Sequence, residues 1–283
     1  MNIENYLVYL AYTMVYLALA VALKHILNRK SSAHYTADDE LKGGNMAVGL
    51  RRSGAQLGLA IAMLGVMSGN AQTNIYSDLI DTSLYGLVAV AFMWFSLVVT
   101  DKAVLPKIDN TAELKKGNIA VGFVEFGTLI MTGILAYASI KGDEGGLLES
   151  LCYFLAGQVT LIALIIAYEK IISRTQDPLK EIANGNFSAG VILGGKVIAY
   201  GLILQSSIIG NAGDEALVNL AGEFIIGAIS GMIFLFIFEY LIDLFIVTSS
   251  TVTEIIKNDE KVLAIQLALT KIGMALILGM AIL

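Results

Sequence analysis

The sequence predicts an all-helical protein that crosses a membrane several times, and three observations carry this prediction. Of the 283 residues, 57% are hydrophobic and 15% are charged, whereas soluble proteins carry about 25% charged residues. Six stretches contain no Asp, Glu, Lys or Arg, at 5–23, 53–77, 82–100, 126–140, 150–168 and 197–213. Several approach the roughly 20 residues that a helix needs to cross the bilayer core. The runs are continuously apolar instead of alternating, which favours helices over barrel strands.

Apolar runs separated by short polar connections predict eight transmembrane helices. We expect them at about residues 6–27, 46–68, 84–104, 119–140, 147–172, 187–209, 217–247 and 262–283. The first run begins close to Met1 without preceding basic residues, so we interpret it as a retained helix and not as a cleaved signal peptide.

The distribution of basic residues predicts how the helices are oriented. Fifteen of the eighteen Lys and Arg residues lie in or beside the odd-numbered connections, and only Lys141 lies in an even-numbered one. Basic residues accumulate on the cytoplasmic side of membrane proteins. We therefore expect the odd connections in the cytoplasm and both termini outside.

One sequence motif occurs at the start of several predicted helices. Residues 40–49 read ELKGGNMAVG and residues 113–122 read ELKKGNIAVG. A third copy carries the Gly-Asn pair at Gly185 and Asn186, and a fourth, around Ala264, lacks this pair. Since each copy covers two spans, the sequence predicts four helical hairpins of one membrane orientation, two in residues 1–142 and two in residues 143–283.

Small residues recur at fixed distances after the asparagine position, which we place at Ala264 in the fourth copy. Nine residues later stand Gly54, Gly127, Gly195 and Gly273, and fifteen later stand Ala60, Gly133, Gly201 and Gly279. Small residues let helix backbones approach closely in a membrane. We interpret these positions as helix contacts.

The motif and its paired helices resemble the bacterial YjfL-like inner-membrane family, a domain of unknown function numbered 350. Its markers in this chain are Gly44-Asn45, Gly117-Asn118 and Gly185-Asn186. The resemblance covers nearly the whole chain and implies a bacterial inner-membrane protein associated with envelope-stress proteins. It assigns no catalytic residue.

The three motif asparagines, Asn45, Asn118 and Asn186, stand where a connection becomes a helix. Asparagine is a favoured N-cap, because its side-chain oxygen accepts a hydrogen bond from a free backbone N–H. The alternative is that the three amides coordinate an ion where the helix N-termini converge.

Ionisable residues inside the spans are the main candidates for function, because each is costly in lipid unless it is paired or hydrated. Arg52, Glu125 and Lys271 stand seven residues after the asparagine position in three copies. We expect Glu125 to pair with Arg52 or Lys271, and the neighbouring Arg51 to extend toward the membrane surface. The alternative is that these charges line a hydrated path.

Lys196 lies ten residues after Asn186, near the middle of its span. A partner from the seventh span is Glu223, near the outer end, although the two differ in depth. Glu239 and Asp243 approach the cytoplasmic end of the same span. Lys196 and Glu223 complete the set of candidate path residues.

The composition also excludes several classes of function. The net charge of −6 without a basic surface argues against nucleic-acid binding. One cysteine and two histidines suit neither a disulfide framework nor a metal site, and no residue pattern indicates a cofactor or an enzyme.

We expect a channel or transporter for a small ion or solute. The alternative is a non-transporting anchor or sensor in an envelope-stress complex. The expected partners are the lipid bilayer, stress proteins of the membrane or cytoplasm, and further copies of the chain.

Overall fold

The computed structural model describes residues 3–68, 74–141, 146–172, 177–209 and 217–282, and within them the chain repeats one three-helix pattern four times. Each unit has a long outer helix, a short helix and an inner helix. The outer helices are α1 (Ile3–Ser31), α4 (Ile75–Val99), α7 (Gly146–Ile172) and α10 (Leu217–Phe245). The short helices are α2 (Ala37–Lys42), α5 (Asn110–Lys115), α8 (Pro178–Ala183) and α11 (Val252–Lys257). The inner helices are α3 (Met46–Met67), α6 (Ile119–Ile140), α9 (Phe187–Ile209) and α12 (Lys261–Ile282). A π-helical turn, η1 (Thr100–Val104), continues α4.

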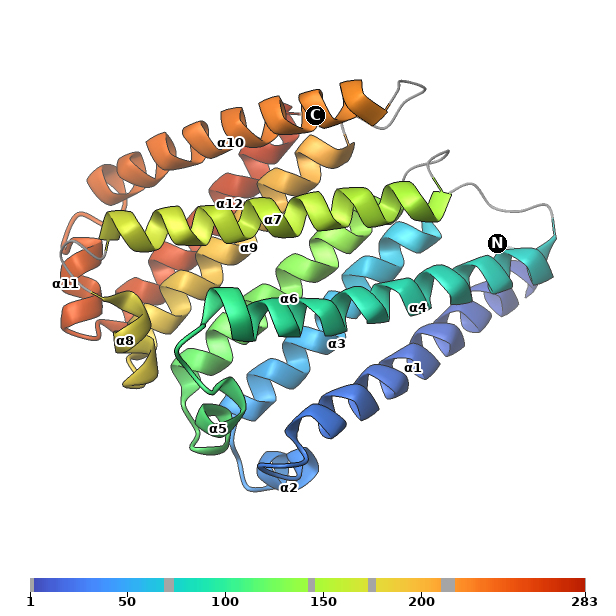
Figure 1. Ribbon diagram of the computed structural model, residues 1–283, viewed down its shortest axis with the longest axis horizontal. Coiled ribbons are helices and arrows are strands. Elements are labelled where there is room, and N and C mark those ends of the chain that lie inside the picture. The colour runs from blue at the N-terminus through green and yellow to red at the C-terminus, as the bar shows by residue number, and fades with distance from the viewer. Residues whose placement is uncertain (1–2, 69–73, 142–145, 173–176, 210–216, 283) are drawn as a thin grey trace.

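The four inner helices form a row in chain order, in which α6 and α9 are central (Figure 1). Glycines let their backbones touch. A Cβ added to Gly127 of α6 would overlap the backbone of Gly194 in α9. One added to Gly54 of α3 would lie 2.8 Å from the Cα of Phe126 in α6. The predicted glycine contacts are confirmed for these helices. Close approach matters here because van der Waals packing is a main source of attraction between helices in lipid.

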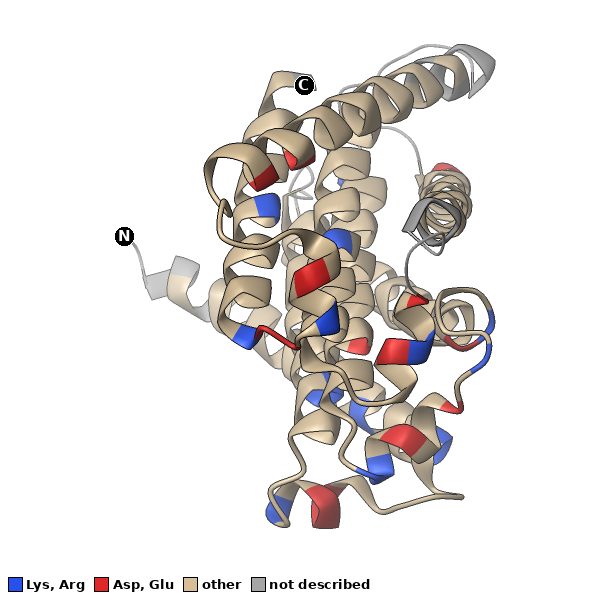
Figure 2. Cartoon of the chain, turned by 90° about the vertical axis from the view of Figure 1, so that its left-hand side faces the viewer, with Lys and Arg blue, Asp and Glu red and all other residues tan. Residues whose placement is uncertain are grey.

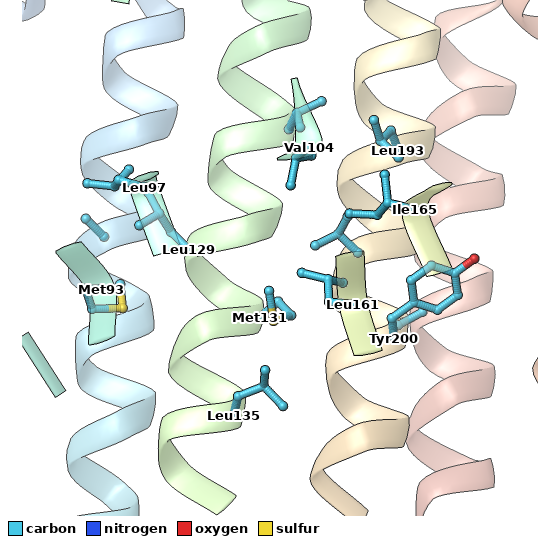
Figure 3. Close-up of a cluster of buried hydrophobic side chains, with 14 of the residues drawn as sticks. Met93, Leu97, Val104, Leu129, Met131, Leu135, Leu161, Ile165, Leu193 and Tyr200 are labelled. Carbon is cyan, nitrogen blue, oxygen red and sulfur yellow. The ribbon is translucent and has the colours of Figure 1, made fainter. Parts of the chain in front are cut away.

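The outer helices cover the grooves between neighbouring inner helices. In this arrangement α4 contacts α3 and α6, α7 contacts α6 and α9, and α10 contacts α9 and α12, while α1 packs on α4 and α3. Large apolar side chains fill the space between the two sets of helices (Figure 3). Examples are Met93 and Leu97 of α4, Leu161 of α7, and Leu129 and Leu135 of α6, all fully or almost fully buried. The row and its cover thus form one continuous apolar core.

Seven of the eight long helices have the length and hydropathy to cross a membrane by themselves. The exception in the described part of the chain is α3, although it is as long as its neighbour α6, at 22 residues. Its apolar character is interrupted by Arg51, Arg52 and Gln56. The predicted all-helical membrane bundle with four repeats is confirmed. Helix α3 belongs to the bundle because it packs along α6, although its own hydropathy is too low to identify it as a membrane span.

All four short helices lie at one end of the bundle, which we call the short-helix end (Figure 1). Viewed toward this side, Lys, Arg, Asp and Glu residues lie mainly around the short helices and their connections (Figure 2). Each inner helix begins at the short-helix end, so the four run parallel to one another. The repeats therefore share one direction along the membrane normal, as the sequence predicts.

Candidate functional site

The asparagine at the start of an inner helix joins its repeat unit to the next one. Asn45 Oδ1 accepts a hydrogen bond from Val48 N at 3.2 Å and so caps α3. Asn45 Nδ2 donates to Leu114 O of α5, in the following unit, at 2.9 Å. The same two bonds recur from Asn118, with Val121 N and Ile182 O, and from Asn186, with Ala189 N and Ile256 O. The predicted capping is confirmed at all three positions. Both ends of each amide are engaged with protein groups, so ion coordination by these asparagines gains no support.

The residue before each asparagine adopts a left-handed backbone conformation. The φ angles are 81° at Gly44, 79° at Gly117 and 85° at Gly185. The fourth unit has Asp259 at this position, with a φ of 51°. Glycine adopts this conformation at little cost and aspartate is one of the few other residues that tolerate it. Asp259 also binds the third unit, because its Oδ1 accepts from Ser188 N at 2.8 Å.

The backbone hydrogen bonds place the fourth asparagine position at Glu260 and not at Ala264. Glu260 N donates to Ile255 O, as Asn118 N donates to Glu113 O before α6. The predicted register of the fourth unit is therefore wrong by four residues. Four residues are close to one helical turn, so either register puts small residues on nearly the same helix face.

Helix contacts confirm this corrected register. Gly127 meets Gly194, which lies eight residues after Asn186, and Gly195 meets Ala268, which lies eight residues after Glu260. Gly273, predicted to mark a helix contact, makes none, because a Cβ added to it would have no atom of another helix within 4 Å. The sequence pattern predicts that Lys271 is equivalent to Arg52 and Glu125. This prediction is wrong, because Lys271 stands eleven residues after Glu260, whereas the other two stand seven residues after their asparagines.

The first buried charge pair joins α3 to α6. Arg51 Nε lies 3.0 Å from Glu125 Oε2, and the two side chains are 4% and 0% exposed. Arg51 Nη1 also donates to Tyr35 Oη at 3.4 Å. Apart from this ion pair, neither carboxylate oxygen of Glu125 has a hydrogen-bond donor among the described residues. Burial raises the pKa of the Tyr35 hydroxyl, so it remains a neutral donor and acceptor beside the pair.

The sequence predicts that Glu125 pairs with Arg52 or Lys271 and that Arg51 reaches the surface, and both predictions are wrong. Successive helix residues point about 100° apart. Arg51 therefore faces α6, whereas Arg52 faces α1 and α2, where it donates to Asn28 Oδ1 and lies 3.5 Å from Asp38 Oδ1.

Arg52 lines a groove of about 590 Å³ beside α1, α2 and α3, together with Tyr16, Lys24, Asp38 and Gln56. Lys24 Nζ lies 3.0 Å from Asp38 Oδ2. The hydrogen bond from Lys24 holds the pKa of the Asp38 carboxyl below its usual range, so Asp38 is ionised at neutral pH. One carboxylate thus neutralises part of the charge of two cations in this groove.

The second set of buried charges lies between α9, α10 and α12, and we call it the lysine cluster: Lys196, Glu239, Asp243 and Lys271. Lys196 Nζ lies 2.9 Å from Glu239 Oε2, and Lys271 Nζ lies 3.6 Å from Glu239 Oε1. The Lys196 and Lys271 side chains are 4% and 3% exposed. Asp243 interacts electrostatically with both lysines. Lys196 therefore pairs with Glu239; Glu223 belongs to α10, but its side chain lies outside the described residues.

The two buried sets occupy related positions in the repeat. Arg51 stands six residues after Asn45, whereas Lys196 stands ten residues after Asn186. Likewise Glu125 stands at position seven of its unit and Lys271 at position eleven. A shift of four residues keeps nearly the same helix face but moves the charge one turn, about 6 Å, away from the short-helix end. The second half of the chain thus holds its charges deeper in the bundle.

Two members of these sets could not be assigned from the sequence. Glu239 and Asp243 stand one turn apart in the otherwise uncharged stretch 224–245 of α10, and this pair of acidic residues was the available signal. Arg51 could not be told from Arg52 without knowing how α3 is rotated. No group of three His, Cys, Asp or Glu residues suited to hold a metal ion occurs among the described residues.

The chain is similar to a known family and to a known transmembrane protein. The model of a Domain of Unknown Function (DUF350) matches residues 1–140 and again residues 144–282. Over 217 residues the chain is 27% identical to a UPF0719 transmembrane protein of Aquifex aeolicus (strain VF5), covering 74% of this chain and 77% of the relative. No solved structure matches the chain. Because the two matched segments span almost the whole sequence, the protein belongs to the DUF350 family of membrane proteins and carries the family's domain twice.

Proposed function

We propose that the protein moves protons or another small ion across the bacterial inner membrane, and that the lysine cluster is the site of passage. The observation that carries this proposal is the position of Lys196 and Lys271 on either side of one carboxylate, Glu239, between helices that can span a membrane. Ionisable side chains are costly in this setting and are typical of ion pathways and proton relays.

The cluster extends from the short-helix end toward the membrane centre. Asp243 stands two residues before Phe245, where α10 ends, and Glu239 stands one turn further in. Lys196 lies nine residues into α9, which corresponds to about 14 Å along the helix axis. Groups that can exchange protons therefore occupy successive depths over roughly half of a 30 Å bilayer core.

Hydroxyl groups continue from the cluster along α9. Tyr200 stands one turn after Lys196, and Ser207 stands two turns after Tyr200. Both are buried, and a Cβ on Gly227 of α10 would lie 3.0 Å from Ser207 Oγ. Hydroxyls can both donate and accept hydrogen bonds, which suits them to relay protons.

The tight packing of the row favours a proton over a larger solute. The cavity beside Arg51 holds about 10 Å³, which is about the volume that one water molecule requires. Beside the lysine cluster, a Cβ added to Gly195 of α9 would lie 2.6 Å from the Cβ of Ala268 in α12, and backbones also touch between α3 and α6 and between α6 and α9. A hydrated metabolite needs a wider opening than these contacts leave.

The same packing supports a second candidate, a non-transporting anchor or sensor. In that case the buried charges fix how the helices pair, and the polar short-helix end binds stress proteins of the membrane or cytoplasm. The Lys30–Asp101 ion pair at 2.6 Å, between the ends of α1 and α4, is one element of that polar end. Both candidates assume a non-enzymatic role, with the short-helix end in the cytoplasm and both termini outside.

Proton flux into liposomes distinguishes the two candidates. Protein in vesicles that enclose a pH-sensitive dye should dissipate an imposed pH gradient faster than empty vesicles. Lys196→Met should slow this flux at least tenfold, because it removes a charged group from the path. Lys261→Met is the matched control, since Lys261 lies at the start of α12 with a largely exposed side chain. Wild-type flux equal to that of empty vesicles, across pH gradients and salts, would favour the anchor.

A further inference from the structure

A groove of about 640 Å³ runs between α1 and α4, apart from the charge sets described above. Its walls are Ile26, Arg29 and Lys30 of α1 and Leu87, Val90, Ala91 and Trp94 of α4. From Leu87 to Trp94 the α4 wall rises about 10 Å. The groove therefore extends over about two helical turns of α4, with apolar walls and two cations at one end.

The cationic end has an unsatisfied positive charge. Lys30 Nζ lies 2.6 Å from Asp101 Oδ2 and donates to Leu97 O at 3.4 Å, so it is held in place. Arg29 is exposed and has no ion-pair or hydrogen-bond partner for its guanidinium among the described residues. With Asp101 counted against Lys30, one positive charge remains at the mouth of the groove.

The apolar part faces away from the protein core. Leu87 is 55% exposed and Trp94 is 51% exposed. Tryptophan concentrates near the membrane–water interface, where its ring packs on acyl chains and its N–H reaches polar groups. Trp94 lies seven residues, about 10 Å, before Asp101, which pairs with Lys30 at the cationic end of the groove.

We propose that this groove binds an anionic phospholipid. The phosphate lies against Arg29 and Lys30, and one acyl chain occupies the groove along Leu87 and Trp94. The match is one of charge and shape together: basic pockets between transmembrane helices bind anionic headgroups, and an apolar groove excludes water from the chain. A zwitterionic lipid fits the floor of the groove equally well but gains nothing from the remaining positive charge.

The groove beside α3 offers an internal comparison. It also contains two cations and one carboxylate and so has the same net charge, but Lys24 and Arg52 both contact the carboxylate of Asp38, at 3.0 and 3.5 Å, and each is held by it. The geometry therefore assigns the lipid site to the α1–α4 groove, where the outermost cation has no such partner.

Trp94 is the only tryptophan in the chain, so its fluorescence reports on this groove alone. The protein is reconstituted into vesicles that contain, at equal mole fraction, phosphatidylglycerol or phosphatidylcholine with brominated acyl chains, because bromine quenches a tryptophan in contact with it. We expect about a fivefold preference for phosphatidylglycerol, equivalent to the ~1 kcal/mol that one basic side chain contributes near anionic lipid. Arg29→Gln should abolish this preference, whereas Arg29→Lys should retain it.

Lys24→Gln is the control, since it removes a cation of the same helix outside the groove, and it should leave the preference unchanged. Equal quenching by the two lipids in the wild type would overturn the proposal, as would an equal loss in Arg29→Gln and Lys24→Gln. If Arg29→Gln does not fold, as judged by circular dichroism, the quenching preference of the wild type is measured at ~50 mM and at ~500 mM salt instead. Salt screens the charge of Arg29, so the preference for phosphatidylglycerol should fall at the higher concentration. A preference that does not change with salt would reject the site. Neither result depends on whether the protein conducts ions.

Discussion

The guanidinium of Arg51 and the carboxylate of Glu125 meet at 3.0 Å between α3 and α6, where both side chains are almost completely withdrawn from the surface. Pairs of this kind are weak as a source of net stability, since burying two charges costs about as much as their attraction returns. Their effect is on which helices can pair and in which rotation. Removing one partner leaves the other charge buried alone.

Glu125→Gln should therefore destabilise the protein by ~3 to 5 kcal/mol, because it leaves Arg51 without its counter-charge. The measurement is unfolding in mixed micelles of detergent and denaturant. The double exchange Arg51→Glu with Glu125→Arg should recover part of the loss. Arg52→Gln is the comparison and should cost less, because its partners Asn28 and Asp38 lie at the edge of the bundle. Equal costs for Glu125→Gln and Arg52→Gln would contradict the assignment of Arg51 as the buried partner.

In the lysine cluster, Glu239→Gln should destabilise more than Lys196→Met does. The first change leaves two buried lysines with only Asp243 nearby, whereas the second leaves the contact between Lys271 and Glu239 in place. We expect a difference of about 2 kcal/mol, within the range for removing one buried charge partner. Thermal unfolding of both variants tests this, and a larger cost for Lys196→Met would mean that Glu239 is not shared.

Gly127→Ala should cost ~1 to 3 kcal/mol, because the new Cβ would overlap the backbone of Gly194 across the α6–α9 contact. Gly273→Ala is the matched control, since no atom lies within 4 Å of the Cβ it would add. It should leave stability unchanged or raise it slightly, because alanine favours a helix more than glycine does. Unfolding of the two variants under identical conditions gives the comparison, and similar costs would argue against backbone contact between α6 and α9.

Asn118→Ala should cost ~2 kcal/mol, from the lost cap of α6 and the lost bond to Ile182 O in α8. Asn118→Asp separates the two contributions. It keeps the oxygen that caps α6 but removes the donor to α8, and it places a second carboxylate beside Glu113. Burial raises the pKa of the Glu113 carboxyl, but hydrogen bonds from Lys116 and Asn118 outweigh burial and hold this pKa below its usual range. We expect Asn118→Asp to remain destabilised at pH 7 and to improve as the pH is lowered toward 4, where carboxylates take up protons. Full stability at pH 7 would mean that the link to α8 contributes nothing.

Membrane orientation can be tested with two engineered thiols. In a Cys152→Ser background, Ser32→Cys should be protected from a membrane-impermeant maleimide in intact cells, and Asn74→Cys should be labelled. Both positions are exposed in the structure, so differences in labelling reflect the side of the membrane. Labelling of Ser32→Cys with protection of Asn74→Cys would reverse the predicted orientation.

Most of the architecture follows from the sequence because hydropathy and small-residue spacing are local properties. Helix starts at Asn45, Asn118 and Asn186 are set by capping within four residues of each asparagine, and the structure has them there. The fourth unit was misplaced for a physical reason: moving four residues along a helix returns to almost the same face, so a small-residue pattern fits both registers. The backbone bond of Glu260 N to Ile255 O separates them, and that bond is not visible in residue types.

The pairing of charges could not be read from the sequence because it depends on which helices are neighbours and how each is rotated. Arg51 and Arg52 are adjacent in sequence, yet one faces α6 and the other faces α1 and α2. Lys196 has acidic residues at two depths of α10, and the crossing of α9 with α10 selects Glu239. Ion pairs across helices are thus a property of the assembled row.

The hydrogen bonds that the motif asparagines make between units all run in one direction along the row. Each of the first three units extends its asparagine to a backbone carbonyl of the unit that follows, and the fourth has Glu260, which has no side-chain amide, at the corresponding place. In the first unit, Leu41 O occupies the position of the acceptors Leu114, Ile182 and Ile256, and no asparagine side chain among the described residues donates to it. Arrays of stacked repeats generally need atypical terminal units to stop them from growing. Here the fourth unit has no amide donor at this position, so it cannot make this bond to the first unit of a second copy of the chain, and any contact between copies at that face has to use other groups.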